Sequence, residues 1–417
     1  MSPRGPGPER VEVAVVGGGP AGALVAARLA RAGREVVLLE GSPAYRWRAC
    51  GVFSSPATVA ALRRAGVDEA TLRRVARPIP AMRVEDGAGT TFRLTYGDDG
   101  SPWRSAVGFD RSALDPALLA MASDAGASVR LGMRVERIDL RSGGSTLAVR
   151  GPTGDGQVVA RLVVGADGRR SLVARTAGVA RAARLRPRVG LTYHLAERPD
   201  EDTGAVATDP PIDARMRVLR DGYVGIAPVP GGRVNVGIVL GGSWSRELAR
   251  DGAPRVAERI LTTIPATASD PADWRHGRPL DRTAGASPIG HRVTRRAGDS
   301  WLLVGDAAGF LDPFTGEGLN RAVVSAELGA RAVDAALRGD RDALAGYDRA
   351  MRHRFAGKDI LSWLIQGFLG RPVLFGYAAR RLAARGAVRE TMGLVIGDLV
   401  PASRVLDPRY LAALLRP

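Results

Sequence analysis

A glycine-rich turn near the start of the chain constrains the fold more than any other feature. The β-branched run Val11–Val16 precedes it and predicts a strand, Ala21–Ala32 predicts a helix, and Glu35–Leu39 predicts a second strand. This strand, helix, strand order is typical of the unit that opens a parallel α/β sheet and binds a dinucleotide at the turn. The predicted dinucleotide-binding residues of the unit are Gly17, Gly19, Pro20, Ala21, Gly22 and Glu40.

Each residue type in this unit has its own physical reason. Gly17 permits a tight turn, Gly19 lets the backbone approach a pyrophosphate, and Gly22 allows close packing between helix and strand. The helix that begins there offers unpaired N–H groups to the anion. Glu40 ends the second strand, where a carboxylate accepts hydrogen bonds from both ribose hydroxyls and repels a 2′-phosphate. We therefore expect FAD or NAD, and not NADP, at this site.

Two later motifs also place polar groups directly after strands. Asp167 and Gly168 follow a strand-like run beside the expected start of a helix, and Asp306 follows Trp301–Val304, where it can bind a ribityl hydroxyl. Gly316–Gly318 then brings backbone N–H groups and a helix N-terminus to one spot. That dipole would stabilise the negative charge of a reduced flavin by up to ~2 kcal/mol. The expected cofactor contacts of this third motif are Asp306, Pro313, Gly316, Gly318 and Leu319.

Between these motifs the chain predicts a second layer. Met82–Glu85 and Thr91–Thr95 indicate strands joined by Gly/Asp turns, and Met216–Leu240 predicts a hairpin that turns at Pro230-Gly231-Gly232. Strands connected by such short turns are antiparallel. We therefore expect a mostly antiparallel sheet beside the parallel one.

The positive charge of the chain leaves three explanations open. The formal net charge is +17, and Lys358 is the only lysine, so nearly every cation is an arginine. A nucleic-acid binder, a protein at an anionic membrane and an arginine-rich proteome would each produce this bias. The arginine run between Arg175 and Arg188 contains no acid and none of the aromatic residues that interleave in nucleic-acid sites. We expect no nucleic-acid partner, and an arginine-biased, solvated surface for most of the excess.

Several other classes are excluded by composition. The single cysteine, Cys50, cannot form an internal disulfide, and the four histidines show no metal-ligand spacing, so we expect a reducing cytoplasm and no metal. Residues 1–10 form a Pro/Gly-rich leader without the apolar core of a signal peptide. The longest uncharged stretch, Val13–Ala27, is shorter than the ~18 residues that a membrane span requires. These features predict a cytoplasmic protein.

The three motifs, in this order, resemble those of the FAD-dependent oxidoreductases with the p-hydroxybenzoate hydroxylase fold. That group includes class A flavin monooxygenases and geranylgeranyl reductases, and the resemblance extends from about Val11 to Leu337. The segments Gly305–Gly309 and Thr315–Gly318 look more like those of the reductases, as does Cys50-Gly51.

Other segments are similar to different branches of the same group. Arg46–Ala49 and Asn320 resemble hydroxylase sequences. The halogenase branch carries Trp-x-Trp-x-Ile-Pro in the substrate sheet, where this chain has Tyr223–Pro228 without either tryptophan. We therefore do not expect halogenation.

The pattern of elements and the resemblance together predict the fold class. We expect an α/β protein in which a Rossmann-like FAD-binding domain is interleaved with a mostly antiparallel β-sheet substrate domain, followed by C-terminal helices. The expected parts are a flexible leader (1–10), a discontinuous FAD-binding domain (11–75, 105–185 and 285–340), a substrate-binding β domain (76–104 and 186–284) and a C-terminal helical segment (341–417).

The resemblance also implies roles for single side chains. Arg111 matches an arginine that contacts the flavin cofactor, and Arg48 is expected near the FAD pyrophosphate. Cys50 matches the reductases' cysteine, where a thiol would protonate one carbon of a double bond while the other receives hydride. Its alternative interpretation is a small buried hydrophobe. The residues interpreted as ordinary strand residues outside catalysis are Tyr193, His194, Tyr223 and His291.

The expected activity is the FAD-dependent reduction of a C=C bond, with NAD(P)H as electron donor, in a hydrophobic isoprenoid, polyketide or phenolic lipid. The alternatives are a class A flavin monooxygenase and, after it, a non-redox FAD-binding scaffold or cyclase. The apolar stretch Ile360–Leu369 predicts a buried core helix, with a substrate tunnel or peripheral membrane contact as alternatives. The arginines that follow it and can meet lipid phosphates are Arg371, Arg380, Arg381 and Arg385. No motif indicates the oligomeric state.

Overall fold

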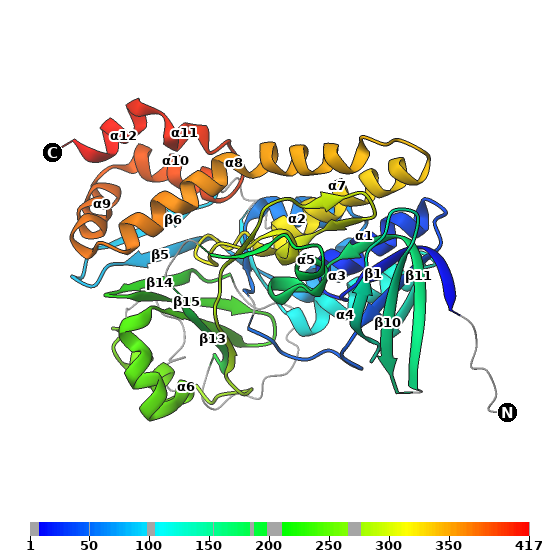
Figure 1. Cartoon of the computed structure of the whole chain (residues 1–417). Coiled ribbons are helices and arrows are strands. Elements are labelled where there is room, and N and C mark those ends of the chain that lie inside the picture. Colours follow the sequence, from blue (N-terminus) through cyan, green and yellow to red (C-terminus); the bar gives the residue numbers. More distant parts are fainter. Residues whose placement is uncertain are drawn as a thin grey trace.

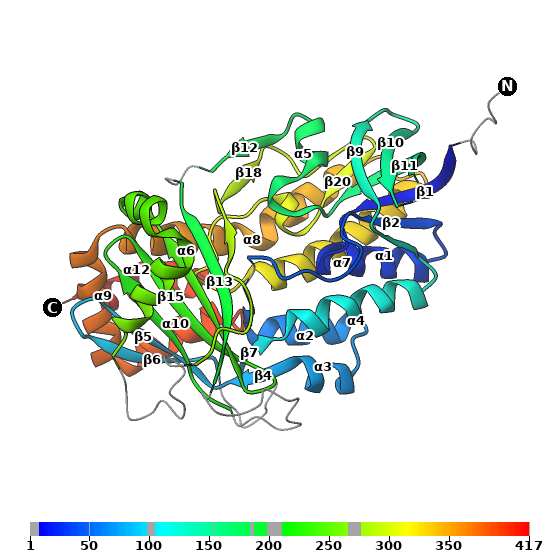
Figure 2. The same ribbon diagram turned by 90° about the horizontal axis from the view of Figure 1, so that it is seen from below.

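Two large sheets, one mainly parallel and one mainly antiparallel, form the body of the protein, and helices cover their outer faces (Figure 1). The computed structural model describes residues 8–49, 51–97, 105–152, 154–183, 187–197, 211–265 and 277–416. The parallel sheet and the last residues of the chain lie at opposite ends of the molecule (Figures 1 and 2). The predicted fold class is confirmed.

The first sheet has eight strands in the order β19-β20-β11-β1-β2-β8, with β10 and β9 added antiparallel beside β11. β1 pairs parallel with both β11 and β2, as the strand, helix, strand pattern predicts. The strands are β1 (Glu9–Val16), β2 (Val36–Glu40), β8 (Ser128–Leu131), β9 (Arg134–Asp139), β10 (Ser145–Gly151), β11 (Gly154–Gly165), β19 (Ala297–Gly298) and β20 (Trp301–Leu303).

Both faces of this sheet are buried, which explains the continuous apolar run of β1. Val13 and Val15 belong to the core formed with α1 (Pro20–Arg31), α4 (Arg111–Asp124) and α7 (Gly318–Leu337). Ala14 and Val16 belong to the core on the opposite face, with β9, β10 and α5 (Leu172–Thr176). The strands of a parallel sheet that is covered on both faces have continuously hydrophobic rather than alternating sequences.

The second sheet has seven strands in the order β17-β13-β16-β15-β14-β5-β6, all antiparallel except the β14–β5 pair. The strands are β5 (Ala81–Glu85), β6 (Thr91–Thr95), β13 (Val189–Ala196), β14 (Ala214–Leu219), β15 (Gly222–Val229), β16 (Arg233–Leu240) and β17 (Ala284–Ala286). The predicted hairpin turn falls between β15 and β16, and a further turn before Gly222 adds β14 as a third strand. α6 (Ser245–Thr262) covers one face, and the C-terminal helices with Phe310 and Phe314 cover the other.

Two small sheets connect these layers. β3 (Phe53–Ser54), β7 (Ala106–Phe109) and β4 (Ala76–Ile79) form one, next to α2 (Pro56–Arg64) and α3 (Glu69–Val75). β12 (Ala180–Ala182) and β18 (His291–Val293) form the other. β4, which opens the expected 76–104 part of the substrate domain, thus pairs outside the seven-stranded sheet, and the domain boundaries stay predictions.

The C-terminal helices pack against the second sheet and against one another (Figure 1). They are α8 (Ala343–Leu369), α9 (Pro372–Ala384), α10 (Gly386–Ile396), α11 (Ser403–Leu406) and α12 (Pro408–Leu415). The prediction that Ile360–Leu369 is buried all round is wrong, because Ile360, Trp363 and Leu364 are 52%, 39% and 42% exposed. Within the described ranges, every helix falls short of the length and apolarity needed to cross a bilayer.

Candidate functional site

The three glycines of the turn after β1 have different physical roles. Gly17 has φ of +104°, and a Cβ there would lie 2.5 Å from the carbonyl oxygen of Ala166. A Cβ on Gly22 would lie 1.9 Å from the carbonyl oxygen of Gly17, so only glycine fits. Gly19 has no atom within 4 Å of the Cβ position. The first two glycines are therefore required by the fold, whereas Gly19 faces open space where a ligand can approach.

The N-terminus of α1 is built to receive an anion. Gly19 is its N-cap without any side-chain cap, Pro20 occupies the first turn, and that turn contains no acid. The first N–H groups of the helix are therefore left for a ligand, at the positive end of the helix dipole. A pyrophosphate fits this arrangement.

Glu40, at the end of β2, is held as a carboxylate beside this turn. It accepts hydrogen bonds from the Gly18 amide at 2.8 Å and from the Ser42 amide and the Arg48 guanidinium at 2.9 Å each. Burial alone would raise the pKa of Glu40, but these three donors outweigh it and the pKa is lowered. Arg48, which we expected near the pyrophosphate, thus lies next to Glu40, the residue expected to bind the ribose.

Asp167 and Gly168, at the end of β11, adjoin the same turn. A Cβ on Gly17 would lie 2.8 Å from the Asp167 Cα. One Asp167 carboxylate oxygen accepts a hydrogen bond of 2.6 Å from the amide of Leu172, the first residue of α5, while the other is buried without a protein partner. Burial raises the pKa of Asp167. Gly168 adopts φ of +75°, which lets the chain turn toward the cofactor side.

The third motif begins where the N-termini of α1 and α7 meet. Gly305, with φ of +57°, leaves so little room that a Cβ would lie 2.8 Å from the Ala21 Cβ. Asp306 follows in the short helix η4 (Gly305–Ala308). Burial raises the pKa of Asp306, and the positively charged side chains that act against this are Arg169, Arg111 and Arg321. Segments far apart in the sequence thus converge on one carboxylate.

The N-terminus of α7 provides a second anion-stabilising position. Gly316 has φ of +68°, and a Cβ there would lie 2.5 Å from the Phe53 ring. Its amide donates to the Pro313 carbonyl at 3.0 Å, which closes the turn. α7 starts at Gly318 without a side-chain cap, and Leu319 anchors its first turn in the core.

Of Arg111 and Cys50, the structure describes Arg111 alone. Arg111 opens α4 and forms a bidentate ion pair with Asp115 at 2.7 and 2.9 Å, while it also donates to the Gly51 carbonyl at 3.4 Å. Cys50, the predicted proton donor, lies outside the described residues. Arg111 therefore reaches the residue next to Cys50 in sequence.

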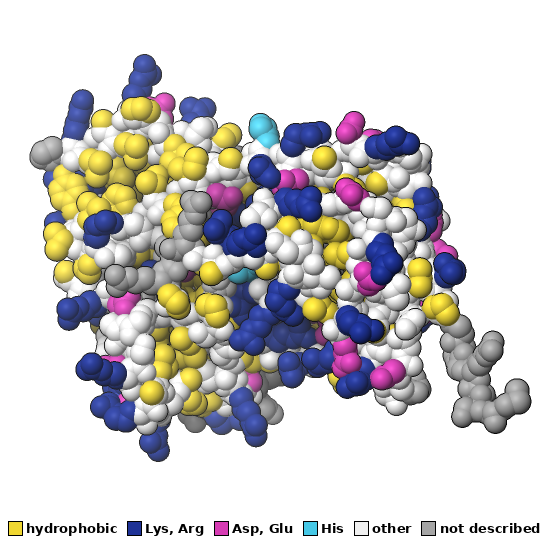
Figure 3. All heavy atoms as spheres, in the orientation of Figure 1, with side chains coloured by type: hydrophobic (Ala, Val, Ile, Leu, Met, Phe, Trp, Pro, Cys, Tyr) yellow, Lys and Arg dark blue, Asp and Glu magenta, His cyan; other side chains and the backbone are white. Residues whose placement is uncertain are grey.

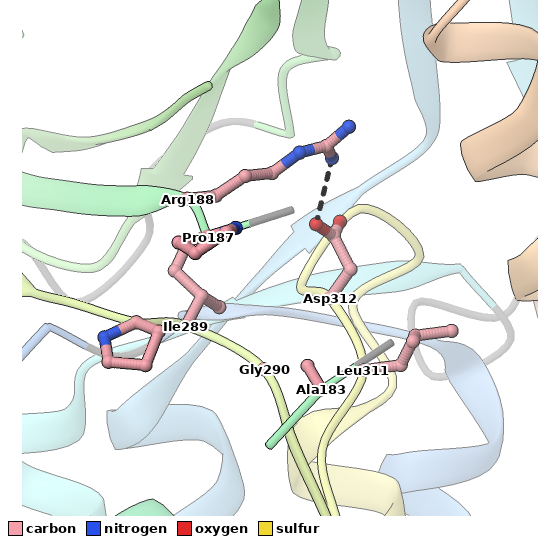
Figure 4. Close-up of a pocket in the computed structure, with 8 residues that line it drawn as sticks. Ala183, Pro187, Arg188, Ile289, Gly290, Leu311 and Asp312 are labelled. Atoms are coloured by element: carbon pink, nitrogen blue, oxygen red, sulfur yellow. Dashed lines mark hydrogen bonds and ion pairs between the residues drawn. The ribbon is translucent and has the colours of Figure 1, made fainter. Parts of the chain in front are cut away.

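A small cavity opens beside the third motif (Figure 4). Its wall contains Arg188 and Asp312, which form an ion pair of 3.2 Å. Asp312 also accepts a hydrogen bond of 2.5 Å from the Tyr223 hydroxyl, and Arg188 donates one of 2.5 Å to Gln366. The remaining lining residues are Ala183, Pro187, Pro288, Ile289, Gly290 and Leu311. The lining of this small cavity is thus mostly apolar, with one anchored ion pair.

The inner face of the second sheet has a polar cluster at one side. His194 is buried, its Nδ1 lies 2.7 Å from Asp281, and its ring packs 4.4 Å from the Trp47 ring. The Asn235 side chain donates to the Thr192 hydroxyl at 3.0 Å on the neighbouring strand. Trp47 therefore connects the segment before Cys50 to this sheet.

Two glycines lie opposite each other in the middle of this inner face. Gly225 on β15 pairs with Gly237 on β16, and both are partly exposed although their sequence neighbours are buried. A Cβ on Gly225 would have its nearest neighbour at 3.5 Å, the methyl carbon of Met216. Side chains could be accommodated here, so the small residues leave space above the sheet.

The geometry fits FAD, with two uncapped helix N-termini, an ionised acid for ribose and a buried carboxylate for the ribityl chain. Residues 10–358 match the family model described as FAD binding domain. The chain belongs to the FAD-binding domain family. It is an FAD-dependent oxidoreductase, which confirms the predicted enzyme class and flavin cofactor.

Curated relatives of this FAD-binding enzyme include two reductases. A menaquinone reductase from Mycolicibacterium smegmatis is 30% identical over 330 residues, which cover 77% of this chain and 76% of the relative. Digeranylgeranylglycerophospholipid reductase 2 from Methanopyrus kandleri is 31% identical over 331 residues, which cover 78% of each chain. The predicted geranylgeranyl reductase-like branch is confirmed by these similarities.

Solved structures with the same fold as the FAD-binding enzyme are named for different kinds of flavoprotein. A flavoprotein/dehydrogenase from Cytophaga hutchinsonii has a TM-score of 0.78 at 20% identity, covering 97% of this chain and 95% of that one. The flavin-dependent brominase Bmp2 has a TM-score of 0.75 at 17% identity, covering 93% of each chain. At these identities the likeness shows the fold alone.

Some side-chain contacts at the site of the FAD-binding enzyme could not be predicted from its sequence. His291, which we placed outside the site, contacts the Asp306 carbonyl through Nε2 at 2.5 Å and pairs with Phe310 through backbone hydrogen bonds. Asp312 stands inside the third motif, yet its partner Tyr223 is distant in sequence. Only the packing of segments that are distant in sequence could reveal these roles.

Proposed function

We propose that this flavoenzyme reduces a carbon–carbon double bond in an isoprenoid lipid, with NAD(P)H as electron donor. The observation that carries the proposal is the similarity, over more than three quarters of each chain, to a menaquinone reductase and a digeranylgeranylglycerophospholipid reductase. Both names denote lipids with isoprenoid chains. The lipid class is therefore inferred from relatives, and the site is consistent with it.

The lining of the site supports a hydrophobic substrate. Gly225 and Gly237 leave the middle of the sheet without side chains, and the cavity beside Asp312 is lined mainly by apolar atoms. Apolar pockets bind lipid tails, and a few fixed polar groups orient them. Arg188 and Asp312, which hold each other in place, are the polar groups available to orient a head group at this end.

When bound, FAD would supply the hydride equivalent. The uncapped N-terminus of α7 at Gly318 stabilises negative charge in front of it, and the turn at Gly316 presents backbone rather than side chains to the cofactor. Cys50 is proposed, from the resemblance, to donate the proton that completes reduction of the double bond. The Arg111 contact with the Gly51 carbonyl ties the chain next to Cys50 to α4.

The decisive experiment is product mass spectrometry after incubation with NADPH or NADH and a prenylated quinone or a polyprenyl diether lipid, with and without oxygen. A gain of two hydrogen atoms that persists under anaerobic conditions supports the proposal. Insertion of one oxygen atom, lost without O₂, would refute it. The Cys50→Ala variant should retain reduction of the flavin by NAD(P)H while losing reduction of the lipid, which separates the two half-reactions.

Oxygenation of the class A type is the second candidate. It is favoured by the hydroxylase-like segment Arg46–Ala49, in which Trp47 packs on His194 and closes one side of the sheet face. Exclusion of water from the site is the requirement of that chemistry. Asn320, the other hydroxylase-like residue, donates to Asp398 at 3.0 Å in the C-terminal region. The oxygen-dependence of the product distinguishes the two candidates directly.

A further inference from the structure

Apolar side chains gather on the outer surface of the C-terminal helices. Figure 3 shows them over this part of the molecule, at the upper left, with basic side chains around them. The exposed ones at the junction of α8 and α9 are Ile360, Trp363, Leu364, Val373 and Leu374. We call these five residues the α8–α9 surface. Val373 is 87% exposed, so it contributes nothing to the folded core.

The helix α8 separates this surface from the interior. Ile360, Trp363 and Leu364 recur at helical spacing on one side, whereas Leu361 and Leu369 are buried on the other. The core of the C-terminal helices already includes Leu361. The exposed side chains are therefore not needed to hold α8 in place, and contiguous exposed apolar surface of this kind marks an interaction site.

The segment that carries the surface has charged side chains of one sign, while Asp359, directly before Ile360, is paired with Arg321. Residues 360–389 contain no aspartate or glutamate, and their charged side chains are Arg371, Arg380, Arg381, Arg385 and Arg389. Arg371, between Leu364 and Val373 in sequence, is exposed. Apolar residues with arginines beside them match the interface of an anionic bilayer, where the acyl region takes the former and phosphates the latter.

We propose that the α8–α9 surface docks the enzyme on an anionic lipid bilayer. A second copy of the chain is the obvious competitor for an apolar face. A symmetric dimer would place the same acid-free, arginine-bearing segment against itself, and like charges oppose that contact. Tryptophan is favoured at the bilayer interface, which suits the position of Trp363 at 39% exposure. The bilayer is thus the better match in both polarity and charge.

The docking surface and the cavity share one helix. Gln366 of α8 accepts the hydrogen bond from Arg188, which lines the cavity, while Trp363 and Leu364 of the same helix turn outward. This relation rests on the proposed function, because it matters only for a substrate that resides in the bilayer. Docking through this surface would bring the cavity close to such a lipid.

The test is vesicle flotation of the full-length holoenzyme, without lipid substrate or NAD(P)H. Because no reaction takes place, a failure to bind vesicles is distinguishable from a failure of the proposed reaction. Phosphatidylglycerol vesicles and phosphatidylcholine vesicles are compared at about 0.1 M and 1 M salt, where the Debye length is about 10 Å and 3 Å. We expect at least tenfold stronger binding to phosphatidylglycerol at low salt, and a clear loss at high salt.

Two double variants and two matched controls locate the contact. Trp363→Ser with Leu364→Ser, and Arg371→Glu with Arg380→Glu, should each weaken binding at least tenfold while the flavin absorbance is unchanged. Leu131→Ser removes an equally exposed leucine at 41%, and Arg141→Glu with Arg331→Glu makes the same charge change at side chains that are 74% and 71% exposed. Both controls should bind vesicles like the parent enzyme.

Three outcomes would overturn the proposal. One is the absence of binding to phosphatidylglycerol vesicles, and another is an equal loss in the control variants. The third is a dimer in sedimentation that the Trp363→Ser, Leu364→Ser variant dissociates while vesicle binding is absent, which would assign the surface to a second copy.

Discussion

The hydroxyl of Tyr223 donates a 2.5 Å hydrogen bond to the carboxylate of Asp312, and this bond joins the second sheet to the loop beside the cavity. Tyr223 lies on β15, whereas Asp312 belongs to the loop between η4 and α7. The Tyr223 ring also packs edge-on against Phe314 at 5.0 Å. Because Asp312 is 3% exposed and also pairs with Arg188, the loop beside the cofactor is fixed by contacts from the substrate sheet.

Removing this hydroxyl should destabilise the enzyme in a pH-dependent way. Burial raises the pKa of Asp312 and the Tyr223 bond lowers it, so Tyr223→Phe should raise this pKa further. A carboxyl with a raised pKa contributes stability at low pH that is lost as the pH rises through the raised value. We expect a loss of about 1–3 kcal/mol in unfolding free energy at pH 8 and a smaller one at pH 5, measured by urea titration.

Tyr193→Phe is the matched control for this change. Tyr193 is also buried on a strand of the second sheet, but it belongs to the core with α6, away from Asp312. Its effect should not differ between pH 5 and pH 8. Equal pH dependence in the two variants would contradict the assignment of the effect to Asp312.

Glu40→Gln should weaken FAD binding at neutral pH. The amide cannot accept charge-assisted bonds from Gly18 and Arg48 as the carboxylate does, and such bonds are worth about 1.5–3 kcal/mol. We therefore expect the Kd for FAD, from fluorescence titration of the apoenzyme, to rise about tenfold to a hundredfold.

The same carboxylate predicts the acid limit of FAD binding. Because the pKa of Glu40 is lowered, the contribution of Glu40 to FAD binding is present above the ordinary pKa of glutamate. It is lost as the pH falls through the lowered pKa. Arg48→Ala removes one cause of the lowering, so FAD release on acidification should begin at a higher pH. Glu40→Gln should show no such shift, and an unchanged acid limit in Arg48→Ala would refute this account.

The only lysine ties the C-terminal helices to the cofactor turn. Lys358 is buried and lies 3.1 Å from Glu317 and 2.9 Å from Asp398, and it donates to the Val395 carbonyl at 2.6 Å. Glu317 is the residue between Gly316 and Gly318. This network therefore spans α7, α8 and the end of α10.

Lys358→Met should reduce the free energy of unfolding by about 3–5 kcal/mol, because it leaves the buried Asp398 carboxylate without its cation and leaves Glu317 with Arg321 alone. Urea unfolding measures this loss. Arg331→Met is the control: its ion pair with Glu327 is at the surface, with Arg331 71% exposed, and such pairs contribute about 0–1 kcal/mol. A loss in Lys358→Met no larger than in Arg331→Met would show that the network does not stabilise the fold.

Gly225→Leu should narrow the substrate site without changing FAD affinity. The new side chain would enter the space above the β15–β16 pair, beside Met216, while the dinucleotide turn is untouched. We expect KM for a polyprenyl substrate to rise at least tenfold, measured by steady-state kinetics. Gly156→Leu, on a solvent-facing part of β11, is the control and should leave KM unchanged. A parallel rise in the FAD Kd would place Gly225 at the cofactor instead.

Local requirements made part of this site predictable. Gly22 is dictated by its contact with Gly17 inside one strand, turn and helix unit, and Gly17 by the positive φ of the same turn, so their spacing indicates their roles. The Lys358 network and the Tyr223 bond depend on how distant elements pack, which no local pattern encodes. The exposed side of Ile360–Leu369 was missed for a related reason, since an apolar sequence does not reveal which side lacks a covering element.

Gly19→Ala separates ligand approach from folding. The position of its Cβ has no neighbour within 4 Å, and Gly19 has φ of −70° and ψ of 178°, which alanine adopts readily. The apoenzyme should therefore unfold at the same urea concentration as the parent. The added methyl group would occupy the space through which the pyrophosphate approaches the N-terminus of α1, so the Kd for FAD should rise at least tenfold. Gly22→Ala is the contrasting variant, because a Cβ 1.9 Å from the Gly17 carbonyl oxygen must disturb the turn itself and destabilise the apoenzyme. If Gly19→Ala bound FAD like the parent, the pyrophosphate would not lie at this turn.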